Sequence, residues 1–392
     1  MAARRVVLVM IEPPSPFGNA AARWFYVLLR GLVARGHRVA AFAACSKPRE
    51  IDEARGLFPS PDYDLRPYPF PAGGGAGSKL RTFRRPYSYM FSPELRRDLG
   101  AELAKGYDVL HLEQLWAGWL GLGHAAKAVV NIHYLARIDL ADAPTSGAAG
   151  LIRHRMMLGA ETRLIRAYPR ITTLSPRLTE AVAAINPRAH VSTVPLGIDA
   201  SLYPFGTDPA PRPPTLGLIG SFDWRPSYAA AERLMTRLWP EIRRRVPDAR
   251  LLVVGRRAKS ALAAFLDTPG LEIAEDVPDA IPYFRAIDAL LYAPPRGSGM
   301  KVKVLEAFAL GTPVVTNAEG IEGLPASDGV HAGVAEDDAG LIERAAALLR
   351  DPGLRESRRV AARALLESHC GPRPTVDAVE AVHESIAAGG RS

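Results

Sequence analysis

Cysteine is scarce in this chain of 392 residues: only Cys45 and Cys370 occur, far apart in the sequence. Two isolated cysteines lack the spacing of a zinc site and cannot build a disulfide framework. A disulfide-stapled secreted domain is therefore excluded, and the expected location is the reducing cytoplasm.

Long apolar runs are absent as well. No stretch approaches the roughly 18 apolar residues that a membrane-spanning helix requires. The amino-terminal sequence MAARRVVLVMI has arginines before an apolar run, as signal peptides do. Because this run of six residues leads directly into EPPSPFG, we interpret it as a first buried strand.

The glycine fingerprint of a dinucleotide site is also missing. EPPSPFGNAAAR, and not Gly-x-Gly-x-x-Gly, follows the first apolar run. This lowers the expectation of a nicotinamide-dependent dehydrogenase to a distant alternative. Gly18 and Asn19 nevertheless precede a predicted amphipathic helix, Asn19–Arg35, and the N–H groups at a helix start can receive an anion.

The composition itself is that of a globular protein, with 48% hydrophobic and 23% charged residues. The net charge is +8 and the pI about 9.6. Part of the positive charge lies in Ser78–Leu99, SKLRTFRRPYSYMFSPELRRDL, where six basic residues are mixed with four aromatic ones. Such a segment could contact an anionic membrane surface or an acidic ligand. An ordinary solvated basic surface is an equally good interpretation.

Short apolar runs alternate with amphipathic segments along the whole chain, which predicts parallel sheets wound by crossover helices. The strand-like runs are RVVLVMI, HRVAAFAA, DVLHLE, AVVNIH, ITTLS, TLGLIGSF, RLLVVGR, LEIAED, DALLYAPP and TPVVTN. Beyond the first helix, further helices are predicted at Tyr228–Arg245, Ala258–Leu266, Val302–Leu310 and Ala339–Leu349.

The length predicts two domains of about 100–200 residues each. The segment VPLGIDASLYPFGTDPAPRPPT holds six prolines and is typical of a linker. We therefore predict an α/β protein with doubly wound domains over residues 1–190 and 215–370, joined by a linker over 191–214. Residues 371–392 are predicted to form a last helix, and whether it crosses back to the first domain is left open. Ligands bind at the carboxyl ends of the strands in such sheets, so the loops there are the first candidates for a site.

RGSGMKVKVLEAFALGTPVVTN, from Arg296 to Asn317, is the most unusual local pattern. Gly297 and Gly299 allow the backbone to approach a ligand closely. Lys301 and Lys303 stand near the start of a predicted helix, where the helix dipole already attracts anions. Two lysines beside unpaired N–H groups suit a diphosphate.

Glu306 lies within VLEAFAL, on a helix that looks apolar all round and is therefore expected to be buried. A buried carboxylate needs hydrogen bonds or a cation. Two sugar hydroxyls would satisfy it, each donating to one carboxylate oxygen. The alternative is a structural role, either an ion pair with Lys301 or Lys303 or a bond that caps a neighbouring loop.

GSGMKVKVLEAFALGTPVVTNAEGIEGL resembles the donor-nucleotide motif of the retaining GT-B glycosyltransferases of family 4. Further segments resemble the family in the same order: GHRV, YDVLHLE, TTLSPRLTEAV, VSTVPLGID, GSFDWRPSYAA and PDARLLVVGR. The resemblance implies a GT-B fold, in which two Rossmann-like domains face each other across a cleft. It also implies transfer of a sugar from a nucleotide diphosphate to an acceptor hydroxyl, with retention of the anomeric configuration and without a metal.

The resemblance assigns the donor site to the second domain. Glu306 would bind the ribose hydroxyls of the nucleotide, while Lys301, Lys303 and the N–H groups around Gly299–Met300 would hold the diphosphate. The other candidate donor-binding residues are Ser221, Arg225, Arg256, Ser298 and Val304.

In the first domain the resemblance points to two places. His133 falls where family members place a histidine near the donor sugar and the acceptor, so it is the candidate catalytic residue; a satisfied structural histidine is the alternative. Gly18 and Asn19 fall where a Gly-Gly loop lies against the phosphates, on the diphosphate or acceptor side. Trp116 and Trp119 are expected to be core residues, and His111 a strand-packing residue beside Glu113.

The chain departs from the family pattern in several ways. The Glu-x(7)-Glu motif requires an acid at position 298, and the chain has Ser298, which leaves the donor sugar open. FDWRPS replaces an Arg…Lys pair, with Arg225 or Arg256 as possible substitutes. No acid follows His133 in the region of Ala136 and Arg137.

The expected co-substrate is a nucleotide sugar of the UDP or GDP type, with no other cofactor. No metal is expected, because no Asp-x-Asp pattern accompanies the motif and the acidic residues Glu336–Asp338 lie outside it. The acceptor would be a glycan, a lipid-linked sugar or a small molecule, and nucleic acid is not expected. Peripheral contact with the inner face of the membrane through Ser78–Leu99 is left open. Two alternatives are a GT-B sugar-nucleotide epimerase and, because of Ser298, a non-catalytic nucleotide-sugar-binding subunit.

Overall fold

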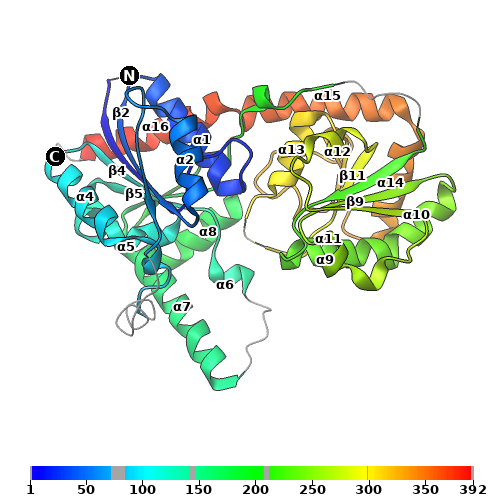
Figure 1. The fold of residues 1–392 in the computed structure, drawn as a ribbon, viewed down its shortest axis with the longest axis horizontal. Helices are drawn as coiled ribbons and strands as arrows, with labels where there is room; N and C mark the ends of the chain where they lie inside the picture. Colours follow the sequence, from blue (N-terminus) through cyan, green and yellow to red (C-terminus); the bar gives the residue numbers. More distant parts are fainter. Residues whose placement is uncertain (1, 72–83, 141–146, 207–211, 298, 390–392) are drawn as a thin grey trace. The chain divides into compact units, whose positions relative to one another are not determined.

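The structure is a computed structural model, and it describes residues 2–71, 84–140, 147–206, 212–297 and 299–389. The chain divides into two compact units, Met1–Ile198 with Pro372–Ser392, and Asp199–Gly371 (Figure 1). One division falls inside the segment predicted as a linker, and the other falls at the start of the predicted last helix. Within the described ranges, no helix is both long and apolar enough to cross a membrane.

The first unit is built on a sheet of seven parallel strands in the order β3-β2-β1-β4-β5-β6-β7. The order reverses between β1 and β4, and ligands bind at such a switch point in doubly wound sheets. The strands are β1 (Arg5–Met10), β2 (Arg38–Cys45), β3 (Asp64–Pro69), β4 (Val109–Glu113), β5 (Ala128–Ile132), β6 (Arg170–Thr173) and β7 (His190–Thr193).

Helices from both ends of the chain cover this sheet. α1 (Ala20–Ala34) and α16 (Pro372–Gly389) lie side by side (Figure 1). Gly31 makes this close approach possible, because a β-carbon there would come within 2.2 Å of Val376 Cγ2. The other helical segments are α2 (Pro48–Leu57), η1 (Ser88–Met90), α4 (Pro93–Ala104), η2 (Leu115–Ala117), α5 (Gly118–Gly121), η3 (Leu122–Lys127), α6 (Ala136–Asp139), α7 (Gly147–Ala167) and α8 (Pro176–Ile185).

The second unit has six parallel strands in the order β10-β9-β8-β11-β12-β13, with its switch point between β8 and β11. The strands are β8 (Thr215–Ile219), β9 (Arg250–Gly255), β10 (Leu271–Glu275), β11 (Ala289–Tyr292), β12 (Val314–Thr316) and β13 (Gly333–Val334). Figure 1 shows helices on both faces of this sheet. The described helical segments of this unit are η4 (Ala200–Leu202), α9 (Arg225–Arg233), η5 (Leu234–Leu238), α10 (Trp239–Arg245), α11 (Ala258–Ala261), η6 (Ala263–Phe265), α12 (Ile281–Arg285), α13 (Val302–Leu310), α14 (Asp338–Arg350) and α15 (Pro352–His369).

The predicted α/β class with two parallel sheets is confirmed, and all ten apolar runs form strands. The helix expected at Tyr228–Arg245 begins three residues earlier, at Arg225, and contains the π-helical segment η5. The helix expected at Ala258–Leu266 is interrupted at Leu262. Trp116 and Trp119 lie in η2 and α5, where they are 2% and 5% exposed, so their prediction as core residues is confirmed.

Candidate functional site

The loop after β11 leads into α13 at the switch point of the second sheet. Lys301 stands at the N-cap position of α13 without a side-chain capping bond, and its Nζ donates to the Gly299 carbonyl. The other end of α13 closes at Gly311, whose φ of 79° is in the left-handed region that favours glycine. The predicted donor residues Lys301, Lys303 and Glu306 therefore lie together on the first half of one helix, at the carboxyl ends of the strands.

Lys303 is held by Ser227 on α9 and by Tyr292 at the end of β11. Its Nζ donates to Ser227 Oγ at 2.8 Å and lies 3.9 Å from the centroid of the Tyr292 ring. Gly220 leaves room for it, since a β-carbon there would come within 2.7 Å of Nζ. Burial lowers the pKa of Lys303 to about 7, and the charge of Glu306 opposes this while that of Lys301 adds to it. An ammonium that has lost its water in this way favours an incoming anion.

Glu306 is half-buried, so the prediction of a fully buried carboxylate is wrong. It shares a partly exposed face of α13 with Val302 and Lys303, one turn away, while the helix positions between them are buried. The helix is thus apolar on one side only. The charge of Glu306 acts on Lys303, as the structural alternative requires, and the partial exposure also leaves the carboxylate accessible to a ligand.

Residues after β12 support the loop that precedes α13. The Gly297 N–H donates to Glu319 Oε2 at 3.1 Å, and Asn317 Nδ2 donates to the Pro294 carbonyl at 2.9 Å. Asn317 and Glu319 belong to TNAEG, a segment near the end of the motif. The sequence alone assigns no role to either residue. Position 298, the main departure from the family pattern, lies outside the described residues.

Two further predicted donor residues follow neighbouring strands: Ser221 lies in the loop after β8, and Arg256 directly follows β9. Ser221 Oγ donates to Asp223 Oδ1 at 2.6 Å, Arg256 Nε donates to Ser221 Oγ at 3.0 Å, and Arg256 Nη2 lies 2.9 Å from Asp223 Oδ2. These hydrogen bonds hold the pKa of Asp223 below its usual range. To bind a ligand phosphate, Arg256 would therefore have to give up its ion pair with Asp223.

The other three predicted donor residues differ in accessibility. Arg225 is exposed at the first position of α9. Met300 and Val304 are 6% and 0% exposed, and the Val304 N–H already donates to the Lys301 carbonyl at 2.9 Å. The Val304 side chain is thus a core residue, and any part it has in binding must come through its neighbours.

Across the described ranges, no group of three or more His, Cys, Asp or Glu residues is arranged to hold a metal ion. Within the acidic segment Glu336–Asp338, Asp338 pairs with Arg233 at 2.8 Å and with Arg237 at 2.5 Å, and Glu336 accepts from the Ala318 N–H.

In the first unit, His133 follows β5 at the carboxyl edge of the sheet and is 6% exposed. Its Nε2 lies 2.9 Å from Oε2 of Glu113, the last residue of β4. Trp24 Nε1 donates to the other oxygen of Glu113 at 2.8 Å. Burial raises the pKa of the Glu113 carboxyl, but His111, His133 and the hydrogen bonds outweigh it and hold the pKa below its usual range.

Glu113 is a candidate site residue that is not predicted from the sequence, where it appears only as a neighbour of the strand-packing residue His111. A signal for it exists, because HLE and NIH place polar residues at every second position near the ends of two successive apolar strands. His111 Nδ1 lies 2.9 Å from Nε2 of His383 on α16, so His111 also packs as predicted. Burial keeps the pKa of His383 well below its usual value, which leaves that imidazole neutral.

Gly18 and Asn19 have structural roles at the start of α1. Asn19 Oδ1 accepts from the N–H groups of Ala21 at 2.9 Å and Ala22 at 3.0 Å, and its Nδ2 donates to Glu12 Oε2 at 2.6 Å. A β-carbon on Gly18 would come within 2.6 Å of the Ala22 β-carbon. The Asn19 side chain thus already accepts from two of the helix-start N–H groups predicted to receive an anion. The phosphate role of this loop remains a prediction.

The segment after His133 is fixed by a buried acid from α7. Glu161, which is 0% exposed, accepts from the Ala136 N–H and from Arg137 Nε, each at 2.6 Å. The sequence shows no acid in this region, because the carboxylate comes from a residue that is distant along the chain.

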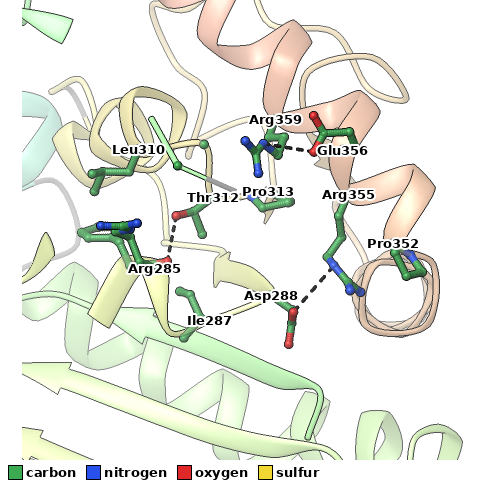
Figure 2. A pocket seen from close by; sticks show the side chains of 13 residues that line it. Arg285, Ile287, Asp288, Leu310, Thr312, Pro313, Pro352, Arg355, Glu356 and Arg359 are labelled. Carbon is green, nitrogen blue, oxygen red and sulfur yellow. Dashed lines mark hydrogen bonds and ion pairs between the residues drawn. The ribbon is translucent and has the colours of Figure 1, made fainter. Parts of the chain in front are cut away.

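A pocket of about 290 Å³ lies elsewhere in the second unit, near the starts of β11 and β12 (Figure 2). Four of its charged side chains pair with one another: Arg355 lies 3.6 Å from Asp288, and Arg359 lies 3.3 Å from Glu356. The predicted donor loop is at the opposite, carboxyl end of the same strands. The pocket is therefore separate from the predicted donor site.

Comparison with known proteins identifies both halves of the chain. Residues 21–202 match the family model described as Glycosyltransferase Family 4, and residues 213–351 match the model described as Glycosyl transferases group 1. No curated protein sequence matches the chain.

Solved structures with the same fold include a sucrose-phosphate synthase from Thermosynechococcus elongatus, 18% identical, covering 98% of this chain and 100% of its own, with a TM-score of 0.70. Anabaena HepE, solved with UDP and glucose, is 12% identical, with coverages of 97% and 100% and a TM-score of 0.68. WaaG, a glycosyltransferase involved in lipopolysaccharide biosynthesis, is 16% identical, with coverages of 95% and 98% and a TM-score of 0.63. The two family matches and the shared fold agree with the resemblance in the motifs, and the protein belongs to the group 1 and family 4 glycosyltransferases with the GT-B fold.

Proposed function

We propose that the protein is a retaining glycosyltransferase that moves a sugar from a nucleoside diphosphate to an acceptor hydroxyl. Its place would be in glycan, glycolipid or natural-product biosynthesis. One observation carries the proposal: the desolvated ammonium of Lys303 lies at the switch point of the second sheet, with the accessible carboxylate of Glu306 one helical turn away. A diphosphate needs the first group, and a ribose diol needs the second.

The proposed sugar transfer requires the protein to stabilise the diphosphate as it leaves the sugar. Negative charge grows on the phosphate oxygens, and fixed cations aimed at those oxygens lower the barrier. Lys301 and Lys303 supply that charge at a helix start, so we propose that no metal ion and no cofactor beyond the nucleotide sugar are needed. In the same proposal the departing phosphate helps to take the proton of the acceptor hydroxyl, and His133 orients the substrate.

The donor base and sugar can be tested in one screen. Anabaena HepE was solved with UDP and glucose, which supports testing UDP-sugars before GDP-sugars. The protein would be incubated with each nucleotide sugar, with and without glycan, lipid-linked and small-molecule acceptors, in buffer containing a metal chelator. The expected result is a glycoside whose anomeric configuration, read by NMR, matches that of the donor.

The same screen separates the alternatives. An epimerised nucleotide sugar formed without any acceptor would indicate the epimerase. Tight nucleotide-sugar binding with no turnover on any acceptor would indicate the non-catalytic subunit. Transfer that requires an added divalent ion would contradict the metal-independent part of the proposal.

We also propose that Ser78–Leu99 contacts anionic membrane; residues 72–83 lie outside the described ranges. In the described part of this segment, Arg84 and Arg85 are exposed, and Tyr89 is 45% exposed. Each basic residue near an anionic surface contributes about 1 kcal/mol. Replacing Lys79, Arg81, Arg84 and Arg85 by glutamine should therefore reduce binding to phosphatidylserine liposomes by at least ~100-fold.

The matched control for this prediction replaces four exposed basic residues of the second unit, Arg243, Arg244 and Arg245 on α10 and Lys259 on α11. Binding is measured by co-sedimentation at fixed ionic strength. Equal losses for the two sets would show general charge attraction and contradict a specific contact through Ser78–Leu99.

A further inference from the structure

Glu113 differs from the other buried carboxylates of the first unit in the groups that neutralise it. Glu102 pairs with Arg5, Arg66 and Lys105, Glu161 pairs with Arg137, and Glu380 pairs with Arg35 as well as with His37. Glu113 is 0% exposed, and no arginine or lysine in the described ranges pairs with it. The negative charge of Glu113 is instead stabilised by the imidazoles of His111 and His133 and by neutral N–H donors.

The hydrogen bonds around Glu113 fix which atoms carry protons. Thr172 Oγ1 donates to Asn131 Oδ1 at 3.0 Å, which turns the amide NH₂ of Asn131 toward Glu113 Oε2, 3.0 Å away. The indole of Trp24 donates to Oε1. Donors to both oxygens favour the ionised form of Glu113, and its lowered pKa agrees with this. Two groups lie close to His133 Nε2: Glu113 Oε2 at 2.9 Å and Asn131 Nδ2 at 3.1 Å. Because an ionised carboxylate repels an unprotonated nitrogen and Asn131 already donates to Glu113, Nε2 carries a proton and donates it to Glu113.

The other ring nitrogen of His133 is left for a ligand. Nδ1 makes no hydrogen bond within the described part of the chain. The ring is kept in place by Trp24 and Phe25, whose centroids lie 6.1 and 5.8 Å away. Gln114, directly after Glu113, has a φ of 65° without being glycine, and such strain is concentrated at functional sites.

We propose that Glu113 is a positioning residue: it holds His133 as the Nε2–H tautomer, so that Nδ1 accepts a hydrogen bond from a substrate hydroxyl. The tautomer follows from the geometry of the first unit alone. The identity of the ligand as a hydroxyl-bearing sugar substrate rests on the proposed function. Two readouts therefore separate the two claims.

The first readout is the His133 tautomer in the wild-type protein. Proton–nitrogen NMR on protein labelled with ¹⁵N-histidine distinguishes the two ring nitrogens, and His133→Gln assigns the signal. The expected result is a protonated Nε2 and an unprotonated Nδ1. A protonated Nδ1 with an unprotonated Nε2 would overturn the proposal, whatever reaction the protein catalyses.

The second readout compares Glu113→Gln with Glu102→Gln, which also removes a buried carboxylate but lies away from His133. Only Glu113→Gln should change the His133 tautomer, since its amide can present a donor to the imidazole. It should also lower kcat by roughly 10–100-fold, as expected for a misplaced group, with donor affinity unchanged. Glu113→Asp should keep the wild-type tautomer and recover part of kcat.

Several outcomes would contradict the positioning role. They are an unchanged tautomer in Glu113→Gln, an equal change in Glu102→Gln, or a fall in donor affinity in place of kcat. If Glu113→Gln does not fold, Glu113→Asp and the wild-type tautomer decide the question. If no transfer is found with any substrate, the proposed function fails, while the NMR result still confirms or rejects the role of Glu113.

Discussion

Replacing Glu306 by alanine is expected to weaken nucleotide-sugar binding by roughly 100-fold while the fold persists. A hydrogen bond to a charged group contributes about 1.5–3 kcal/mol, and a carboxylate that accepts from both ribose hydroxyls makes two of them. Even about 3 kcal/mol in total corresponds to a loss of roughly 100-fold. The fold should persist because Glu306 lies on the partly exposed face of α13 and not in its core.

Isothermal titration calorimetry with the nucleotide sugar identified in the screen measures this loss. Glu343→Ala is the matched control, since Glu343 is an exposed glutamate on α14 in the same unit. Its affinity should equal that of the wild type. If Glu306→Ala binds as tightly as the control, the ribose assignment is wrong and the ion pair with a lysine becomes the explanation for Glu306.

Replacing Lys303 by methionine is expected to have two opposite effects, a loss of diphosphate affinity and a gain in stability. Methionine keeps an unbranched apolar side chain, one atom shorter than lysine, beside Tyr292 but removes the desolvated ammonium. The affinity for a nucleoside diphosphate should fall by roughly 10–100-fold, as for one charge-assisted contact, and that for the free nucleoside should not change. Equal losses for both ligands would contradict the phosphate contact.

The stability effect has a defined pH dependence. The pKa of Lys303 is lowered in the folded protein to about 7, from an ordinary value of 10.5. Between these values the unfolded chain binds a proton that the folded protein has released, so this lysine makes the free energy of unfolding rise with pH. From pH 7 to pH 9 the rise should be about 2 kcal/mol greater in wild type than in Lys303→Met.

Urea unfolding at the two pH values tests this difference. Lys259→Met, at an exposed lysine on α11, is the control and should follow the wild type. Binding should show the reverse trend, because a diphosphate restores the proton on Lys303 and its affinity therefore falls above pH 7. A variant with the same pH slope as wild type would show that the Lys303 ammonium is not desolvated.

The sequence predicts the second unit well because its signals are local. α13 has the predicted bounds, Val302–Leu310, since its apolar run ends at a glycine with positive φ.

β3 of the first unit, with the sequence DLRPYP, is not predicted from the sequence. It carries two prolines and is half-exposed at the sheet edge, so it has neither the composition nor the burial of the central strands.

The polar site of the first unit cannot be predicted from the sequence, because it depends on the register between strands. Glu113 pairs with Asn131 across β4 and β5, and only this pairing brings the carboxylate beside His133. Trp24 and His383 reach the same cluster from helices near opposite ends of the chain. Neither register nor helix docking can be derived from one sequence, whereas the lysine and glutamate of α13 need only the helical repeat.

The most direct test of the account is a crystal structure of the protein with a bound nucleoside diphosphate, beginning with UDP. The account predicts Glu306 within about 3 Å of both ribose hydroxyls and the ammonium groups of Lys301 and Lys303 against the diphosphate. A nucleotide bound elsewhere, such as in the pocket of Figure 2, or a ribose without contact to Glu306, would contradict it.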